Sequence, residues 1–340
     1  MVSVIVPFHN AGQWIERCAR SLFSQTAADE CEFIFVDDAS TDSSPDLLSD
    51  LIRRERPDAI LIRNPRNLGV AEARFVGIDA ARGEYVLSID ADDRPEPDMV
   101  EALLARARLT DADLVCCEAD IDFADHTEPR TFRYDREMRR HLADPANFTE
   151  VHVAFWNKLI RRSLIVDNGI RPFPGVDYGE DSAVTFRLRY LSRRTEIVHR
   201  TLYHYNQRNA ASMMQRLSEK AALQRVELAA RLDEFVQEQK RKQEAEVDLT
   251  LAVNWYKFQS KEYWLRVAGN PLRHPRRWLR ALRRWASIYP ESHRDIRRFP
   301  LLSPAGRLKW RLAALLGAAV KKPVTLNPNQ ANQNPQDDAN

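Results

Sequence analysis

The sequence lacks the short glycine-rich and serine motifs that mark several common enzyme folds. No GxGxxG follows the first apolar run, whose turn spans residues 7–12, and this absence argues against an ordinary dinucleotide-binding fold. A GxxxxGK[ST] phosphate loop and a GxSxG nucleophile elbow are also missing. Any nucleotide that the chain binds must therefore be held in another way.

Cysteine is scarce, and no CxxC pair occurs. The four residues are Cys18, Cys31, Cys116 and Cys117. No histidine stands at a spacing that would complete a zinc site. Cys116 and Cys117 belong to an apolar, strand-like run, so we expect them to be buried as small hydrophobic side chains. This usage is typical of a reduced protein and predicts a cytoplasmic location.

Long hydrophobic runs are missing as well. No stretch reaches the roughly 18 uninterrupted apolar residues that a membrane-spanning helix needs, and the apolar run at 312–320 is too short. The chain opens on a strand-like run, without the basic and apolar regions of a secretory signal. We therefore expect any membrane contact to be peripheral, on the inner face.

Charge is distributed unevenly along the 340 residues. The formal net charge is +2, and a composition of 44% hydrophobic and 29% charged residues is typical of a globular protein. Residues 264–322 hold fifteen Lys or Arg against two acidic residues, whereas residues 1–263 hold 36 against 45. The basic surface therefore belongs to the C-terminal segment.

Strand-like and helix-like segments alternate through the first part of the chain. Apolar runs typical of strands lie at 3–7, 32–36, 59–62 and 85–89. Helical spacing lies between them at 11–25, 44–55 and 69–82, with Gly83 as the expected C-cap of the last helix. The alternation predicts an α/β fold, with a mostly parallel sheet flanked by helices.

The pattern changes further along the chain. We expect helices at 97–109 and 181–191, strands at 114–117, 156–160 and 196–204, and an irregular stretch at 120–148. Residues 217–267 are helical in pattern, 276–289 read as an amphipathic basic helix, and 327–340 have a disordered composition. The predicted domains are an α/β domain at 1–215, a basic helical region at 216–322 and a disordered tail at 323–340.

Aspartates follow two of the predicted strands. Asp37 and Asp38 come after one, and Asp90-x-Asp92-Asp93 comes after another. In parallel sheets ligands bind beyond the carboxyl ends of the strands, and carboxylates there suit a hard divalent cation. An ordinary polar turn, or a cap on the helix at 44–55, is the alternative that the pattern leaves open.

The ordered motifs of the chain resemble those of family-two inverting glycosyltransferases of the GT-A fold. The resemblance is carried by Val2–Asn10, Phe35–Asp42, Asn67-x-Gly69 with Arg74, Ile89–Asp93, Trp156-Asn-Lys158, Gly179-Glu-Asp181 and Tyr203-His-Tyr205. It covers about residues 1–215, with 1–100 as the nucleotide-binding half and 101–215 as the acceptor half. Each motif alone is weak, but the ordered set is specific.

The resemblance implies a nucleotide-sugar donor, with a UDP-sugar expected. Pro7 and Phe8 would line the base pocket, with the Phe8 ring available for stacking. Asp37 and Asp38 would bind the donor, Asp38 accepting from the uracil N3–H. Further donor-binding residues would be Asn67, Arg74, Asp90, His204, Arg208 and Ser212. Asp92, supported by Asp90, would hold Mg²⁺ or Mn²⁺ against the diphosphate.

The resemblance also implies the catalytic residues. Asp181 would take the proton of the acceptor hydroxyl, and Glu180 beside it would position the acceptor. The acceptor would be a glycan or a lipid-linked sugar in surface polysaccharide synthesis. Two positions depart from the family pattern: Ala39 replaces a common glycine, and Phe75 replaces a common Asn. Neither change removes a group that the chemistry needs.

Several alternatives stay open at this point. Asp181 could simply complement a helix dipole, Arg74 could be a solvated charge, and His204 and Trp156 could be packing residues. For the whole protein, the alternatives are a non-catalytic nucleotide-sugar-binding assembly protein and a nucleotidyltransferase. The latter would bring a basic, glycine-rich phosphate loop near the first strand, which this sequence lacks.

The basic helix at 276–289 has two interpretations. Trp278, Leu282, Trp285 and Tyr289 share one face, and arginines fill the rest. The helix could lie on an anionic membrane with its tryptophans at the headgroups, or it could pack its aromatic face on the catalytic domain. No recognised module supports nucleic-acid binding.

Overall fold

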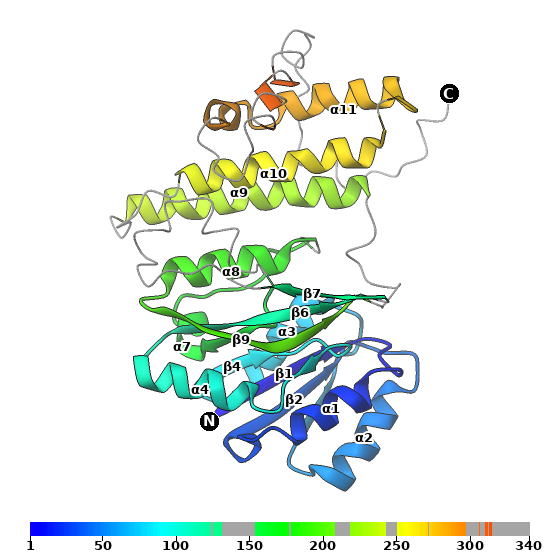
Figure 1. The fold of residues 1–340 in the computed structure, drawn as a ribbon, viewed down its shortest axis with the longest axis vertical. Coiled ribbons are helices and arrows are strands. Elements are labelled where there is room, and N and C mark those ends of the chain that lie inside the picture. The colour runs from blue at the N-terminus through cyan, green and yellow to red at the C-terminus, as the bar shows by residue number, and fades with distance from the viewer. Residues whose placement is uncertain are drawn as a thin grey trace. The chain divides into compact units, whose positions relative to one another are not determined.

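The computed structural model describes residues 1–123, 125–130, 154–176, 178–207, 218–242, 250–270 and 272–296, with residues 306, 310, 311, 313 and 314. The chain divides into two compact units, Met1–Val253 and Asn254–Asn340 (Figure 1). The predicted tail at 323–340 lies outside the described residues, as does most of the stretch at 120–148.

A single sheet forms the centre of the first unit. Its strands run in the order β3-β2-β1-β4-β8-β6-β9-β5, and β7 pairs with β6 outside this path. The strands are β1 (Val2–Phe8), β2 (Cys31–Asp37), β3 (Ile60–Arg63), β4 (Tyr85–Ser88), β5 (Arg94–Pro95), β6 (Leu114–Asp122), β7 (Thr127–Arg130), β8 (Lys158–Arg161) and β9 (Thr195–Asn206).

The sheet is parallel in its N-terminal half and mixed in the other half. β1 pairs in parallel with β2 and β4, and β2 pairs in parallel with β3. β8 then lies antiparallel between β4 and β6, whereas β6 and β9 are parallel. The α/β fold with flanking helices is confirmed, and antiparallel pairing is the addition that the sequence pattern did not predict.

Helices cover both faces of the sheet. On one face lie α1 (Ile15–Phe23), α2 (Ser44–Glu55) and α4 (Met99–Thr110). The short η1 (Ala28–Glu30) comes directly before β2. On the other face lie α3 (Val70–Ala80), α7 (Arg162–Val166) and α8 (Glu180–Leu191). Successive residues of β1 point to opposite faces. Val4 and Val6 therefore pack with the first group of helices, and Ile5 packs with the second.

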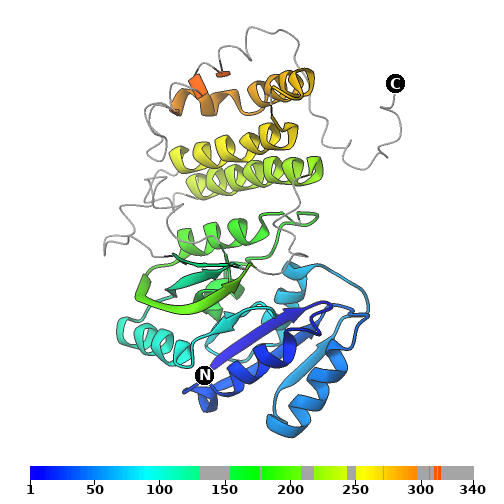
Figure 2. The same ribbon diagram turned by 45° about the vertical axis from the view of Figure 1, so that its right-hand side comes forward.

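The helical pattern predicted at 217–267 corresponds to two long helices. α9 (Glu219–Arg241) begins at Ser218, whose hydroxyl accepts from the Ala221 amide at 3.1 Å and caps the helix. Both ribbon views place α8 between the sheet and α9 (Figures 1 and 2). α10 (Thr250–Ala268) follows, and no helix of the described residues is long and apolar enough to cross a membrane.

Part of the stretch predicted to be irregular is regular instead. β6 continues to Asp122, and β7 turns back on it in an antiparallel pair over Ala119–Asp122. The sequence did not show this hairpin because β6 carries alternating acidic residues there and β7 is a four-residue strand that contains a proline. The four cysteines are free and buried, as expected of small hydrophobic side chains.

The second unit has an aromatic core. α11 (Pro275–Ser287) and η3 (Pro290–Asp295) enclose Trp285, which is fully buried and lies 6.2 Å from Phe258 and 5.4 Å from Trp310 between ring centroids. The expectation that the tryptophans of this helix reach lipid headgroups is therefore wrong for Trp285. Its ring packs against Phe258 of α10. The exposed arginines of α11 are Arg276, Arg277, Arg280 and Arg283, whereas Arg284 lies over the Trp264 ring.

Candidate active site

Arg74 lies at the centre of a cluster of side chains that the sequence placed far apart. Its side chain, on α3, is 3% exposed. The guanidinium donates to Asp181 Oδ1 at 2.6 Å, to Asp90 Oδ1 at 3.3 Å and, through Nε, to Ser88 Oγ at 3.0 Å. It also lies 5.1 Å from the centre of the Phe155 ring. One buried cation thus joins the end of β4, the start of α8 and the segment before β8.

Negative charge exceeds positive charge in this cluster. Burial raises the pKa of Asp90 to about 6, with Arg74 opposing the shift and Asp181 adding to it. Burial also raises the pKa of Glu180 to about 8, helped by the neighbouring Asp181. Burial acts against the charge of Arg74, but Asp181 and Asp90 outweigh it and raise the pKa of the guanidinium. An additional cation would relieve the repulsion.

Asp181 is held in a fixed orientation by two donors. Arg74 binds Oδ1, and the Phe155 amide donates to Oδ2 at 3.1 Å. The side chain stays 21% exposed. Asp181 stands in the first turn of α8, where the helix dipole also favours a carboxylate. Gly179, with a φ of +87°, precedes this helix. The geometry leaves Asp181 anchored but open to a substrate.

The turn that carries the metal-ligand candidates is anchored from behind. The Asp93 amide donates to the Asp90 carbonyl at 3.0 Å. Asp93 is fully buried, accepting from the Tyr203 hydroxyl at 2.5 Å and the Asn206 amide at 2.7 Å. Asp92 is half-buried, and its carbonyl accepts from Arg17 Nη2 at 2.7 Å and from Asn206 Nδ2 at 3.2 Å. Asp93 is therefore the structural anchor of this turn.

Asp38 organises the loop that precedes α3. Its carboxylate accepts from Asn64 Nδ2 at 2.8 Å, from the Leu68 amide at 2.9 Å and from the Gly69 amide at 2.8 Å. Asn67 Oδ1 also accepts from the Gly69 amide, at 3.1 Å. These bonds occupy the acceptor positions of Asp38 that the expected contact with a uracil N–H would use, so such a contact would have to share them.

The first aspartate pair and the end of β1 are buried. Asp37 is 4% exposed and accepts from the Ser40 amide at 2.9 Å, which closes the turn after β2. Pro7 is buried, and Phe8 is 4% exposed and packs into the core. The Phe8 ring therefore presents no open face for the base stacking that the resemblance implied.

The aromatic residues of the later motifs form a packed stack. Trp156 is 3% exposed and lies 4.3 Å from Tyr203 and 5.4 Å from Tyr205, nearly parallel to both rings. Trp156 is thus a packing residue. The motifs alone indicate no role for Tyr203, because Asp93, to which its hydroxyl donates, lies 110 residues earlier in the chain.

The residues expected to close over the pyrophosphate are only partly described. His204 Nε2 faces Glu96 Oε1 in hydrogen-bonding contact, and His204 pairs across the sheet edge with Arg94 of β5. It lines a pocket separate from the Arg74 cluster, together with Trp14, Arg17, Arg94, Asp122 and Asn206. Arg208 and Ser212 lie outside the described residues, so their role stays a prediction.

The carboxylates of Asp90 and Asp92 fit a divalent cation whose remaining ligands come from a substrate. Within the described ranges, no group of three or more His, Cys, Asp or Glu is arranged to hold a metal ion alone. Asp90 and Asp92 place two carboxylates on one turn, and burial, with smaller contributions from Asp181 and Asp92, raises the pKa of Asp90. Mg²⁺ usually binds through one or two carboxylates plus phosphate oxygens, which is the donor set that this turn offers.

Comparison with known proteins places the first unit in context. Residues 3–168 match the family described as "Glycosyl transferase family 2". EpsH of Bacillus subtilis strain 168, which carries the name of a glycosyltransferase, is 32% identical over 225 residues. The match covers 64% of this chain and 64% of EpsH, so it spans less than two thirds of that relative.

Solved structures share the fold. The crystal structure of TarS residues 1–349 from S. aureus, in complex with UDP-GlcNAc, is similar with a TM-score of 0.65 at 18% identity, covering 93% of this chain and 88% of TarS. The mannosyltransferase PcManGT from Pyrobaculum calidifontis, in complex with GDP-Man and Mn²⁺, is similar with a TM-score of 0.54 at 18% identity, covering 94% of this chain and 85% of PcManGT.

Proposed function

We infer that this chain, which belongs to glycosyltransferase family 2 through residues 3–168, transfers a sugar from a nucleoside-diphosphate donor to an acceptor hydroxyl with inversion. The observation that carries the inference is the contact of Arg74 with both Asp90 and Asp181. It unites a carboxylate turn suited to a metal-bound diphosphate with a carboxylate suited to act as a base. A merely structural turn would not need both groups in one cluster.

Asp181 is the proposed general base. The acceptor oxygen attacks the anomeric carbon on the face opposite the leaving diphosphate, and its proton passes to Asp181. Arg74 and the Phe155 amide fix the carboxylate, so little reorganisation is needed before proton transfer. Glu180, adjacent on α8, is the proposed residue that positions the acceptor, by accepting a hydrogen bond from another of its hydroxyls.

Asp92, supported by Asp90, is the proposed holder of Mg²⁺ or Mn²⁺. When bound, the cation would neutralise the charge that develops on the diphosphate leaving group. Arg74 contributes a permanent positive charge, with Nη2 at 3.3 Å from Asp90 Oδ1. The Mn²⁺ bound to PcManGT supports a divalent ion here.

A UDP-sugar is the proposed donor. TarS, which shares the fold, binds UDP-GlcNAc, although the GDP-Man of PcManGT shows that the fold also accepts guanine. The proposed acceptor is a glycan or a lipid-linked sugar, reached by peripheral attachment to an anionic membrane through residues 276–289. The exposed arginines of α11, among them Arg276, Arg277, Arg280 and Arg283, support such attachment.

A donor panel tests this function. The full chain is incubated with UDP- and GDP-linked sugars in Mn²⁺, Mg²⁺ or EDTA, and the released nucleoside diphosphate is measured. We expect turnover of at least one UDP-sugar that needs the metal ion and is abolished by Asp92→Ala. Asp50→Ala, which removes a 66% exposed carboxylate, is the matched control and should turn over normally. Metal-stimulated UDP binding without turnover of any donor would favour a non-catalytic binding protein.

A further inference from the structure

We propose that the pocket lined by Trp14, Arg17, Arg94, Asp122, His204 and Asn206 binds a pyranose unit of the acceptor glycan, away from the reacting hydroxyl. The proposal rests on the proposed function, since a glycan is the acceptor there. It assigns a binding site to residues of α1, β5, β6 and β9 that the catalytic cluster does not use.

One helix that lines the pocket, α1, lies on the opposite side of the sheet from α3 and α8. α1, which carries Arg17, packs through Ile15, Cys18 and Leu22 into the core on its own face. α3 and α8, which carry Arg74 and Asp181, pack into the other core. A ligand in the pocket therefore lies beside the Asp90–Asp93 turn without entering the cluster around Arg74.

The chemistry of the lining suits a sugar better than a bare anion. Trp14 lines the pocket and is half-buried, and the Arg17 guanidinium lies over its indole ring at 5.0 Å from the ring centre. A pyranose presents apolar C–H groups on its faces and hydroxyls that both donate and accept around its rim. Asp122 supplies acceptors, Arg17 and Arg94 supply donors, and the Asn206 amide supplies both.

The charges in the lining argue against a phosphate. Asp122 stands within the lining, and Glu96 faces His204 in hydrogen-bonding contact. Arg94 lies 3.5 Å from the same Glu96 carboxylate, so part of its positive charge is already compensated. A pocket with both charge signs, an indole ring and planar polar groups therefore offers more partners to a polyhydroxylated ligand than to a phosphate.

The pocket is connected to the metal-ligand turn through the main chain. Arg17 of α1 and Asn206 of β9 both donate to the Asp92 carbonyl, at 2.7 and 3.2 Å. Cys18, next to Arg17, places its Sγ 3.9 Å from the Asp90 carbonyl. A sugar that contacts Arg17 and Asn206 would therefore also steady the turn that carries Asp92, which links acceptor binding to the donor side.

Saturation-transfer difference NMR on the full chain tests the proposal. The probes are methyl glycosides of glucose, galactose, N-acetylglucosamine and glucuronic acid. We expect at least one to bind, with an affinity that falls about ten-fold in Trp14→Ala and is largely kept in Trp14→Phe, which retains an aromatic face. Arg20→Ala, on the same helix but paired with Glu16 and Glu55, is the matched control and should bind as the unmodified chain does.

Two results would overturn the proposal. Either no glycoside of the panel binds, or a bound glycoside is held equally by Trp14→Ala and the unmodified chain. Thermal unfolding of each variant shows whether it is folded, and Trp14→Phe supplies the comparison if Trp14→Ala is not. Release of nucleoside diphosphate is measured on the same samples, so loss of the pocket alone is distinguishable from failure of the proposed function.

Discussion

At the scale of single residues, the most consequential side chain is Arg74. It is buried, and the two carboxylates that it contacts are only partly exposed, at 26% for Asp90 and 21% for Asp181. A buried charge is tolerated when it is paired, and removing one partner leaves the other uncompensated. Arg74 therefore has a structural role in addition to any role towards the donor.

Replacing Arg74 by Met should remove the charge while keeping much of the volume. We expect the free energy of unfolding to fall by about 3 kcal/mol and sugar transfer to be lost. Urea unfolding followed by circular dichroism measures the first effect. Arg171→Met is the matched control, because Arg171 and its partner Asp79 are 52% and 54% exposed, and it should cost less than about 1 kcal/mol. Equal losses in the two variants would contradict the buried-pair account.

Some residue roles could be predicted from the sequence, and others could not. Arg74, Asp90 and Asp181 stand in motifs, and the structure brings them into contact. The anchoring role of Asp93 was not visible, because Asn206 and Tyr203 lie more than a hundred residues away. Ala39 adopts a φ of +57°, which explains why glycine suits that position and why alanine is strained there.

Gly83 is needed at its position, but not as the helix C-cap that the sequence predicted. The helix before it ends at Ala80 with an extended Ala81, so Gly83 is not its C-cap. A Cβ at Gly83 would lie 2.7 Å from the Ser3 amide nitrogen and 2.9 Å from the Tyr85 carbonyl oxygen. Glycine is required because two strands approach closely, and such a contact between distant segments leaves no local signal.

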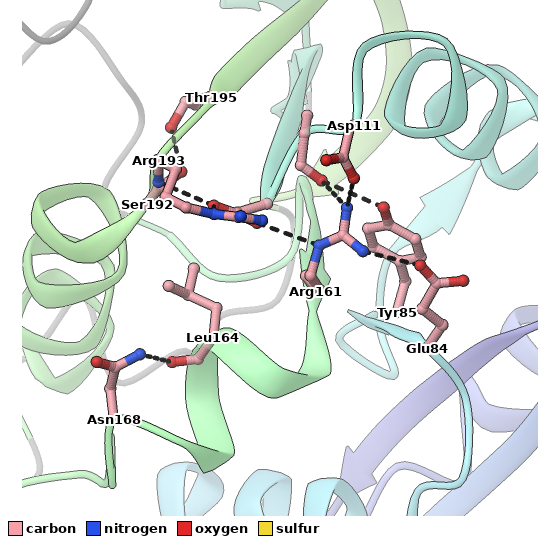
Figure 3. A network of polar contacts seen from close by, with 11 residues as sticks. Glu84, Tyr85, Asp111, Arg161, Leu164, Asn168, Ser192, Arg193 and Thr195 are labelled. Atoms are coloured by element: carbon pink, nitrogen blue, oxygen red, sulfur yellow. Dashed lines mark hydrogen bonds and ion pairs between the residues drawn. The ribbon is translucent and has the colours of Figure 1, made fainter.

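At the scale of elements, a polar network ties the mixed half of the sheet together. Asp113, 4% exposed, accepts from Arg161 Nε at 3.1 Å and from the Arg193 amide at 2.8 Å. Figure 3 shows Arg161 reaching both Glu84 and Asp111, at 2.8 and 2.5 Å. The network thus joins the starts of β4 and β6, the end of β8 and the turn between α8 and β9.

Asp113→Asn should weaken this junction. Burial would raise the pKa of Asp113, but hydrogen bonds from Arg193 outweigh it and lower the pKa. The ionised carboxylate therefore stabilises the fold above the unfolded pKa of about 4, and this contribution is lost as pH falls through the lowered value. We expect the free energy of unfolding of Asp113→Asn to be about 2–3 kcal/mol lower than that of the unmodified chain at neutral pH. This difference should shrink below about pH 4.

Chemical unfolding across this pH range measures the effect. Asp79→Asn, at a 54% exposed carboxylate, is the matched control and should show little loss at any pH. A free energy of unfolding that stays lower by the same amount in Asp113→Asn down to about pH 2 would contradict the stabilising role of the ionised carboxylate.

The parallel half of the sheet could be predicted, and the mixed half could not. Strands β1 to β4 alternate with helices, so their parallel pairing follows from the local pattern. β5 consists of two residues, and β6 takes its parallel partner β9 from a segment that begins 81 residues later, from Leu114 to Thr195. Pairing over that distance is decided by burial and by turns, which a single sequence does not display.

At the scale of the whole molecule, the C-terminal segment is rich in arginine and lysine, whereas the cluster around Arg74 in the first unit is rich in carboxylates. The buried aromatic face of α11 stabilises the second unit itself, through Trp285, Phe258 and His293. Lys261 is buried beneath it and donates to the Ile288 and Tyr289 carbonyls at 2.9 and 3.1 Å. What remains outside is a strip of arginines with Leu279, 47% exposed.

This arginine strip should determine attachment to anionic vesicles. Replacing Arg276 and Arg280 together by Gln should weaken binding to phosphatidylglycerol vesicles about 30-fold, because each basic residue near such a surface contributes about 1 kcal/mol. Vesicle co-sedimentation measures the change, which should disappear at high salt. The double variant Arg53→Gln and Arg54→Gln, on α2, removes the same charge and should bind as before. Equal weakening in both would mean that net charge, and not the strip, is responsible.

The central claim is that Asp181 acts as the base of a nucleotide-sugar transfer. Its most direct test compares Asp181→Asn with the unmodified chain on the same UDP-sugar, measuring kcat from released UDP and Kd from UDP titration. We predict a kcat lowered by a factor of at least about 100, with UDP affinity largely unchanged. Transfer at the unmodified rate by Asp181→Asn would contradict the account.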